Sequence, residues 1–182
     1  MRRSVLRGRV IREAMLGTGL LAALAAYGQT SLNSSANPVY ANHVYGFQVT
    51  LPPGVTYTRT LPPNPDHGIG IALPDRTKVW VDASYTDSSS TEEEAGKQAA
   101  DCRVEQKKET SLGSLSALLI RFSRHASADE RAYEGQFVLS VYRSDHRAPV
   151  CYQILIRATN GRISAQADDL FWKLVAGFSL SR

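Results

Sequence analysis

Four histidines, two cysteines and many serines are the residues of this sequence that could do chemistry. Asp66-His67 and Asp145-His146 each place a carboxylate beside an imidazole. A serine, a histidine and an acid can act together as nucleophile, base and orienting group. Neighbouring residues of a strand point to opposite faces, however, so adjacency in the sequence does not make a catalytic pair. We interpret the histidines as solvated residues of loops and strand ends and assign no catalytic residue.

The motifs that usually accompany catalysis or metal binding are missing. The sequence has no G-x-S-x-G, no H-E-x-x-H and no cysteine–histidine signature. Gly68-Ile69-Gly70 lacks the third glycine of a dinucleotide loop and precedes a strand pattern instead of a helix. We therefore predict no enzyme activity, no cofactor and no metal site.

The first 28 residues are predicted to be a secretory signal peptide. A basic region at 1–13 precedes an apolar run at 14–26, which is shorter than the roughly 20 residues that span a bilayer. Gly17 and Gly19 within the run also disfavour an uncleaved anchor. Arg2-Arg3 resembles the twin-arginine export motif, so both general secretion and export after folding are open. The protein is expected in the periplasm or outside the cell.

The charge distribution narrows the choice of partners. The leader carries five arginines and one glutamate, which accounts for the whole net charge of +4. Residues 29–42 are rich in serine and asparagine and are predicted to be a flexible linker. Residues 43–182 form one electrically neutral domain, which offers no electrostatic footprint for nucleic acid or an anionic membrane. We expect a protein or small-ligand partner, no nucleic acid, and no stable membrane insertion after cleavage of the leader.

Cys102 and Cys151 are the only two cysteines. An even number of cysteines in an oxidising compartment favours a disulfide. Such a bridge would close a loop of about 50 residues and stabilise the fold by about 4 kcal/mol. Two buried free thiols are the alternative, and a metal or redox role is a third. We predict the disulfide between Cys102 and Cys151.

The apolar pattern predicts strands and two helices. Period-two alternation indicates eight strands, at 44–51, 55–60, 67–73, 78–85, 108–112, 115–123, 132–143 and 150–157. The last two are joined by a short polar turn and are predicted to form a hairpin in the centre of the sheet. A first helix is predicted at 91–107, where Thr91 and Glu94 form a capping box, and a second at 164–178 with Ser164 as its N-cap. The second helix has a broad apolar face, made of Leu170, Phe171, Leu174, Val175 and Phe178.

This order of elements predicts an α+β sandwich with a largely antiparallel sheet and two helices. The opening segment Tyr45–Pro53, the helix in mid-chain, the paired long strands and the closing Gly177-Phe178 resemble the PsbP-type α/β/α sandwich. That group includes an extrinsic photosystem protein, a nuclear-import GTPase-binding factor and many exported bacterial proteins. The resemblance implies the fold and carries over no functional residue.

Trp80 and Asp82 form the candidate interaction surface. Together with Ser84 they share one face of the strand at 78–85. The opposite face is predicted to be core and consists of Val79, Val81, Ala83 and Tyr85. Aromatic residues are enriched in interfaces, which favours recognition by the first face. A tryptophan covered by a helix is the alternative.

Three functions compete on these grounds. The leading hypothesis is an exported binding or assembly module without catalysis. A small exported hydrolase would require a histidine, an acid and a nucleophile to converge in one concave pocket. A binder of an apolar ligand would require an open cavity between the sheet and the helices.

Overall fold

The structure is a computed structural model that describes residues 37–60, 66–125, 132–144, 148–159 and 161–181. A large antiparallel sheet has the strand order β3 (Thr58–Thr60), β4 (Gly68–Ala72), β5 (Thr77–Tyr85), β9 (Val150–Ala158), β8 (Tyr133–Tyr142), β7 (Leu115–Arg124) and β6 (Arg103–Leu112). A small sheet has the order β1 (Val39–Asn42), β2 (Phe47–Thr50) and β10 (Phe178–Leu180). The helices are α1 (Thr91–Gln98) and α2 (Ala165–Gly177). The predicted α+β class is confirmed.

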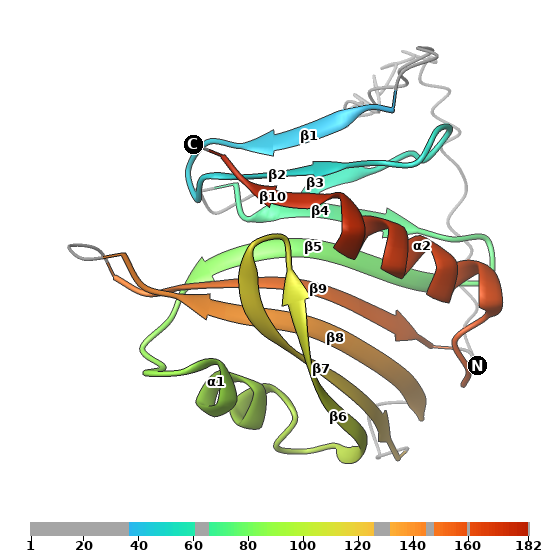
Figure 1. Ribbon diagram of the computed structural model, residues 1–182. Helices are drawn as coiled ribbons and strands as arrows, with labels where there is room; N and C mark the ends of the chain where they lie inside the picture. The colour runs from blue at the N-terminus through green and yellow to red at the C-terminus, as the bar shows by residue number, and fades with distance from the viewer. Residues whose placement is uncertain (1–36, 61–65, 126–131, 145–147, 160, 182) are drawn as a thin grey trace, which may run out of the picture.

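The two helices lie on opposite faces of the large sheet (Figure 1). On one face, α2 contacts β5 and β9, and the small sheet packs into the same core. On the other face, α1 contacts β7 and β8. Strand β9 is the middle strand of the seven, and its hairpin with β8 places Val138 opposite Ile154. The predicted central hairpin is therefore confirmed.

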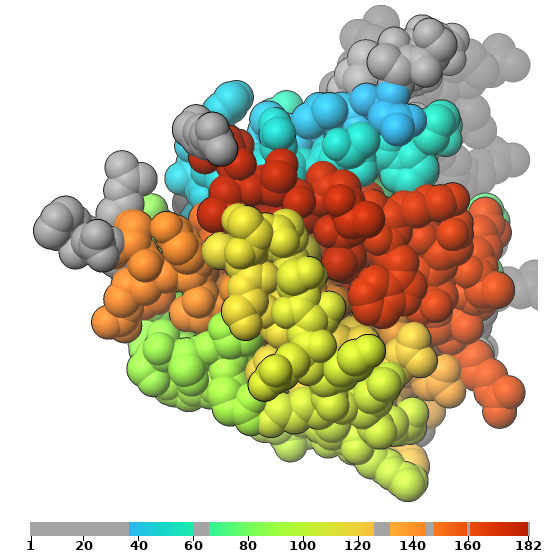
Figure 2. All heavy atoms as spheres, in the orientation of Figure 1, coloured from blue at the N-terminus to red at the C-terminus, as the bar shows by residue number. Residues whose placement is uncertain are grey.

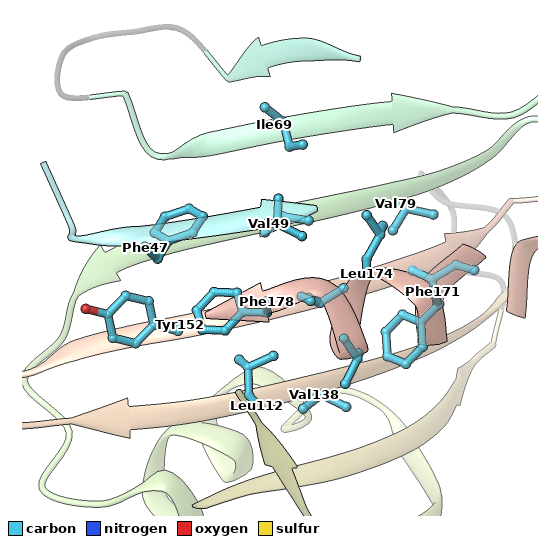
Figure 3. Packing of buried hydrophobic residues seen from close by; sticks show 14 of the residues in the cluster. Phe47, Val49, Ile69, Val79, Leu112, Val138, Tyr152, Phe171, Leu174 and Phe178 are labelled. Atoms are coloured by element: carbon cyan, nitrogen blue, oxygen red, sulfur yellow. The ribbon is translucent and has the colours of Figure 1, made fainter. Parts of the chain in front are cut away.

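The larger apolar core fills the space between the large sheet and α2 (Figure 3). Alternate residues of β9 point into it, and Ile154 has no exposed surface. Phe171 and Leu174 meet the sheet from α2, and both are fully buried. Phe178 of β10 stacks on Phe47 of β2 with 5.5 Å between ring centroids. Burial of these apolar side chains is the main force that joins the two sheets and the helix.

The hairpin of β6 and β7 adds to the layer that α2 and the small sheet form over the main core. In the space-filling view it lies, in yellow, beside the red α2 (Figure 2). Its turn residue Gly113 has φ +59°, and a Cβ there would lie 2.9 Å from the carbonyl oxygen of Phe178. Glycine is therefore needed at this turn both for its backbone conformation and for the close approach of β10.

Helix α2 has the predicted beginning and ends one residue early. Ser164 is its N-cap and accepts a hydrogen bond of 3.3 Å from the N–H of Ala167. At Gly177 a Cβ would lie 2.6 Å from the carbonyl oxygen of Thr50, so only glycine lets β2 pass this close. Phe178, predicted in the helix, is buried but begins β10.

Helix α1 is about half as long as predicted. It ends at Gln98, and the residues from Arg103 onward form the edge strand β6 instead. A helix through this stretch would present no apolar face, because after Cys102 the only apolar residue before Leu112 is Val104, which is 46% exposed. Pairing with β7 satisfies the backbone hydrogen bonds of the charged segment instead.

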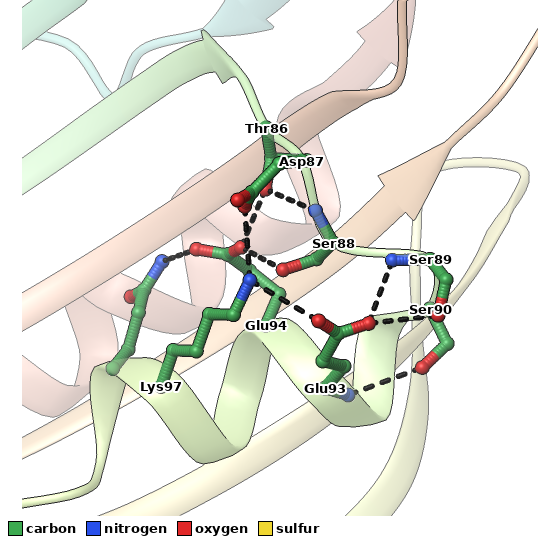
Figure 4. Close-up of polar contacts among 9 residues, drawn as sticks. Thr86, Asp87, Ser88, Ser89, Ser90, Glu93, Glu94 and Lys97 are labelled. Atoms are coloured by element: carbon green, nitrogen blue, oxygen red, sulfur yellow. Dashed lines mark hydrogen bonds and ion pairs between the residues drawn. The ribbon is translucent and has the colours of Figure 1, made fainter.

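The start of α1 is held by a dense set of hydrogen bonds (Figure 4). Ser90, not Thr91, is the N-cap and accepts from the N–H of Glu93 at 3.1 Å. The Glu93 carboxylate in turn accepts from the backbone and side chain of Ser89, and these bonds lower the pKa of Glu93 to about 2. Thr91 accepts from the N–H of Val141 at 3.0 Å, which ties the helix to β8.

Two boundary predictions meet different outcomes. The last residues of the predicted linker, Val39–Asn42, form β1, because they pair with β2 and bury the ring of Tyr40. The linker prediction is wrong for this segment. The predicted signal peptide and residues 29–36 of the linker lie outside the described residues.

The predicted disulfide is absent, because no bridge joins Cys102 to Cys151. Cys151 is buried in the smaller apolar cluster under α1, where the side-chain amide of Gln98 lies 4.0 Å from its Sγ. Burial raises the pKa of Cys151 to about 12, which keeps the thiol protonated and unreactive. Cys102 packs against the same cluster after the end of α1. The apolar surroundings stabilise the thiols without a bridge, so the disulfide prediction is wrong.

The packing of α2 can be tested by truncating its central aromatic side chain. We expect Phe171→Ala to lower the free energy of unfolding by about 3–5 kcal/mol, because it leaves a cavity in a fully buried position. Lys173→Ala, an exposed site on the same helix, should change it by less than about 0.5 kcal/mol. Urea unfolding measures both, and a Phe171→Ala effect below about 1 kcal/mol would contradict the described core.

Candidate functional site

Helix α1 covers only part of its face of the large sheet. It contacts β7 and β8, whereas the neighbouring half of that face, on β4, β5 and β9, lies open. A hollow of about 510 Å³ forms there, lined by His67, Trp80, Asp82, Ser84, Gln153, Leu155 and Arg157. This volume falls in the range of small-molecule binding sites.

The alternation of two paired strands positions the lining residues. On β5 and β9, Trp80 stands opposite Leu155 and Asp82 stands opposite Gln153. The residues between them face the core, as predicted for Val79, Val81 and Ala83. Tyr85, predicted to join that core, is 57% exposed because it ends β5.

The third strand of the hollow, β4, contributes two glycines, which leave space beside β5. A Cβ at Gly70 would lie 3.6 Å from the indole of Trp80, so the ring lies close against the β4 backbone. Gly68 has φ +156°, and a Cβ there would come within 1.9 Å of the carbonyl oxygen of Val81. Glycine is therefore the only residue that allows β4 to pair with β5 beside the hollow.

Arg157 is held by aromatic rings and not by an acid. Its guanidinium carbon lies 4.8 Å from the ring centroid of Tyr133 and 5.8 Å from that of Trp80, which are cation–π distances. Its Nε atom is buried and has no hydrogen-bond partner among the described residues. Within the described part of the chain, no ion pair joins Arg157 to a carboxylate. The result is a fixed cation with unused donors.

His67 is fixed by contacts from two elements. Its Nδ1 lies 2.9 Å from the carbonyl oxygen of Ala83 and 3.2 Å from the hydroxyl of Tyr45, whose ring stacks on the imidazole. Because a carbonyl oxygen only accepts, Nδ1 carries a proton and donates it to Ala83. The other nitrogen, Nε2, makes no hydrogen bond to a described residue.

Asp82 is the acid of the hollow. Burial raises its pKa to about 6, and the nearby His67 partly opposes that rise. The carboxyl group therefore changes between a hydrogen-bond donor and an anion in the mildly acidic range.

The structure brings together the predicted pair Trp80 and Asp82 and adds residues that sequence reasoning missed. His67, interpreted as a solvated loop residue, is half-buried and fixed. His43 and His125 are exposed, and His146 lies outside the described residues. The missed residues Gln153, Leu155 and Arg157 had a signal, because alternation along 150–157 places them on one face.

The hollow contains the residue types of a hydrolase but not their connections. His67, Asp82 and Ser84 all line it, as the hydrolase alternative required. No hydrogen bond joins any two of these three side chains in the described part of the structure. The Nδ1 of His67, which would bind the acid of a triad, instead bonds Ala83. His67, Asp82 and Ser84 therefore form no nucleophile–base pair.

The alternative of an apolar ligand between sheet and helices has no support. That space is filled by core side chains, including Phe171, Leu174 and Phe178 (Figure 3). Among the described residues, no group of three or more histidine, cysteine or acidic side chains could hold a metal ion. No helix within the described ranges is long and apolar enough to cross a membrane.

The fold is similar to two solved structures. LpqN, which is involved in cell envelope biogenesis of Mycobacterium tuberculosis, has a TM-score of 0.54 at 13% identity, over 85% of this chain and 91% of LpqN. The Ran-binding protein Mog1p of Saccharomyces cerevisiae has a TM-score of 0.48 at 14% identity, over 81% of this chain and 96% of Mog1p. No family model and no curated protein matches the sequence. The likeness to LpqN shows a shared α/β sandwich fold and leaves function to the site.

The partly buried carboxyl group of Asp82 predicts a pH-dependent stability. Its pKa of about 6 in the folded state exceeds the ordinary 3.8, so its contribution to stability is full below pH 4 and is lost as the pH rises through 6. Asp82→Asn should therefore be more stable than the wild type at pH 7.5, relative to pH 4, by about 1–3 kcal/mol.

Urea unfolding of both proteins at several pH values measures this difference. Asp87→Asn is the matched control, because the hydrogen bond from Lys97 lowers the pKa of Asp87 and gives the opposite trend with pH. A stability difference between Asp82→Asn and the wild type that is the same at pH 4 and 7.5 would contradict the burial of Asp82.

Proposed function

We propose that this protein is an exported, non-catalytic binding module and that its ligand binds in the hollow over β5 and β9. Export is supported by the leader at 1–28, whose composition is that of a cleaved signal peptide. A domain without excess charge supports a protein or small molecule as partner, in preference to nucleic acid. Membership of the PsbP-type group belongs to the same proposal and is supported by the order of elements.

The unused polar groups of the hollow carry the proposal. Ser84, Gln153 and Arg157 make no side-chain hydrogen bond to another described residue. At the start of α1, by contrast, neighbouring polar side chains satisfy one another (Figure 4). Polar side chains that converge without partners among the described residues, beside the half-buried ring of Trp80, are the arrangement of a binding site.

The absence of catalysis is supported by the bonding of the fixed histidine. A serine nucleophile needs a base within hydrogen-bond reach, and Ser84 has no hydrogen bond to His67. In such a site, the contacts hold a ligand in place and do not activate a nucleophile.

The hydrolase alternative can be tested at Ser84. We expect the protein to hydrolyse p-nitrophenyl acetate and butyrate at the background rate, and Ser84→Ala to leave that rate unchanged. His67→Gln serves as a second variant, because a shared triad would lose activity with either change. A wild-type rate at least ten-fold above that of both variants would replace the binding module with an enzyme.

The binding site itself can be tested by truncating its aromatic wall. We expect fragments found by ligand-observed NMR with the wild type to lose at least ten-fold in affinity with Trp80→Ala, because the indole supplies most of the apolar contact area. Tyr142→Ala, an exposed aromatic residue of another surface hollow, is the matched control and should leave affinity unchanged. Retained affinity in a folded Trp80→Ala variant would contradict this site.

A further inference from the structure

We propose that the hollow binds a small molecule with an oxyanion, a carboxylate or a phosphate, attached to an apolar or aromatic body. This inference rests on the proposed function and names the chemistry of its ligand. Arg157 would bind the oxyanion, and Trp80 with Leu155 would contact the body.

The first support is the state of Arg157. Its guanidinium lies between the rings of Trp80 and Tyr133, and it has no carboxylate partner in the described part of the chain. Its buried Nε lacks a hydrogen-bond partner there. A partly buried cation with free donors is costly for the fold, and an oxyanion that accepts two of its N–H groups relieves that cost.

The position is also geometrically prepared. Aromatic faces on the guanidinium restrict its rotation, so less conformational entropy is lost when a ligand binds. Arg121, in contrast, already bonds Gln136 at 2.8 Å and lies 3.7 Å from the carboxylate of Asp168. Of these two arginines, only Arg157 has no polar partner among the described residues.

The second support is the order of side chains along the hollow. Arg157 and Gln153 are four residues apart on β9, which is about 13 Å along a strand. Trp80 and Leu155, opposite each other, provide an apolar wall between these ends. A ligand of this length places its oxyanion at Arg157 and its body against the indole.

The end of the hollow away from Arg157 disfavours a second anionic group on the ligand. Asp82 stands there opposite Gln153, with His67 beside it. The Asp82 carboxylate repels an anion, and Gln153 and Ser84 offer neutral hydrogen-bonding groups. The charge distribution therefore fixes the orientation of the ligand, with its anionic end away from Asp82.

Three small probes test this chemistry by calorimetry at pH 7 and low salt. They are 4-phenylbutyrate, its neutral amide 4-phenylbutyramide, and phenyl phosphate. We expect both anions to bind the wild type, the amide to bind at least ten-fold more weakly, and Arg157→Gln to lose at least ten-fold in affinity for the anions. A preference for one anion distinguishes a carboxylate ligand from a phosphate ligand.

Fluorescence gives an independent readout of the same site. Trp80 and Trp172 are the only tryptophans, so a Trp172→Phe background reports on Trp80 alone. We expect the anions to change its emission, and this change to disappear with Arg157→Gln. Arg121→Gln, the matched control, should keep both affinity and emission change. If Arg157→Gln does not fold, Arg157→Lys replaces it, with an expected loss of at least three-fold because the planar fork is gone.

The outcomes separate this inference from the proposed function. If Trp80→Ala weakens binding but Arg157→Gln does not, or the amide binds as well as the acid, the anionic ligand is wrong and the site stands. If neither variant changes the affinity of a bound probe, both proposals fail. If Arg121→Gln weakens binding as much as Arg157→Gln, the attraction is general and the inference is overturned. Absence of binding by both anions at millimolar concentration also overturns it.

Discussion

The unequal burial of the two faces of β9 is the constraint on which the rest of this structure depends. On one face, Ile154 and Ile156 have no exposed surface and form the floor of the main core. The other face begins with buried Cys151 and continues through Gln153 to Arg157, which α1 does not cover. The apolar face fixes the strand in the centre of the sheet. Because side chains alternate, the same register then fixes which polar groups stand on the open face.

Helix α1 is short, and the segment that follows it sets its end. The helix ends at Gln98 because the charged segment that follows gains more from pairing with β7 than from a helix without an apolar face. A helix continuing to residue 107, as the sequence predicted, would add about 14 Å of length. The strong capping by Ser90 and Glu93 fixes the start of the helix, and the following strand limits its end.

The parts of the fold that sequence reasoning predicted are those with a long, regular apolar pattern. Strands β8 and β9 and helix α2 bury whole faces, so their periodicity is visible in the residues themselves. The failures have a common cause, which is tertiary pairing. Val39–Asn42 has a weak local pattern but gains a partner in β2. The segment from Arg103 has helix-forming charged residues but gains a partner in β7. The cysteines are close to the same cluster, yet composition alone gives no geometry for a bridge.

For the same reason, only part of the candidate site could be predicted from the sequence. Trp80 and Asp82 share a face by simple alternation, and that part needed no structure. His67 and Arg157 join them only through strand order, because β4 and β9 flank β5 in the sheet although they are about 80 residues apart in the sequence. The pairing of β4, β5 and β9 gives the two ends of the hollow different chemistry. Asp82 and His67 lie at one end, and Arg157, held by aromatic rings, lies at the other. The fold shared with LpqN, at 13% identity, does not imply that the same residues stand on this face. It arises from the particular residues on the open face, so those residues, and not the fold, limit what this protein can bind.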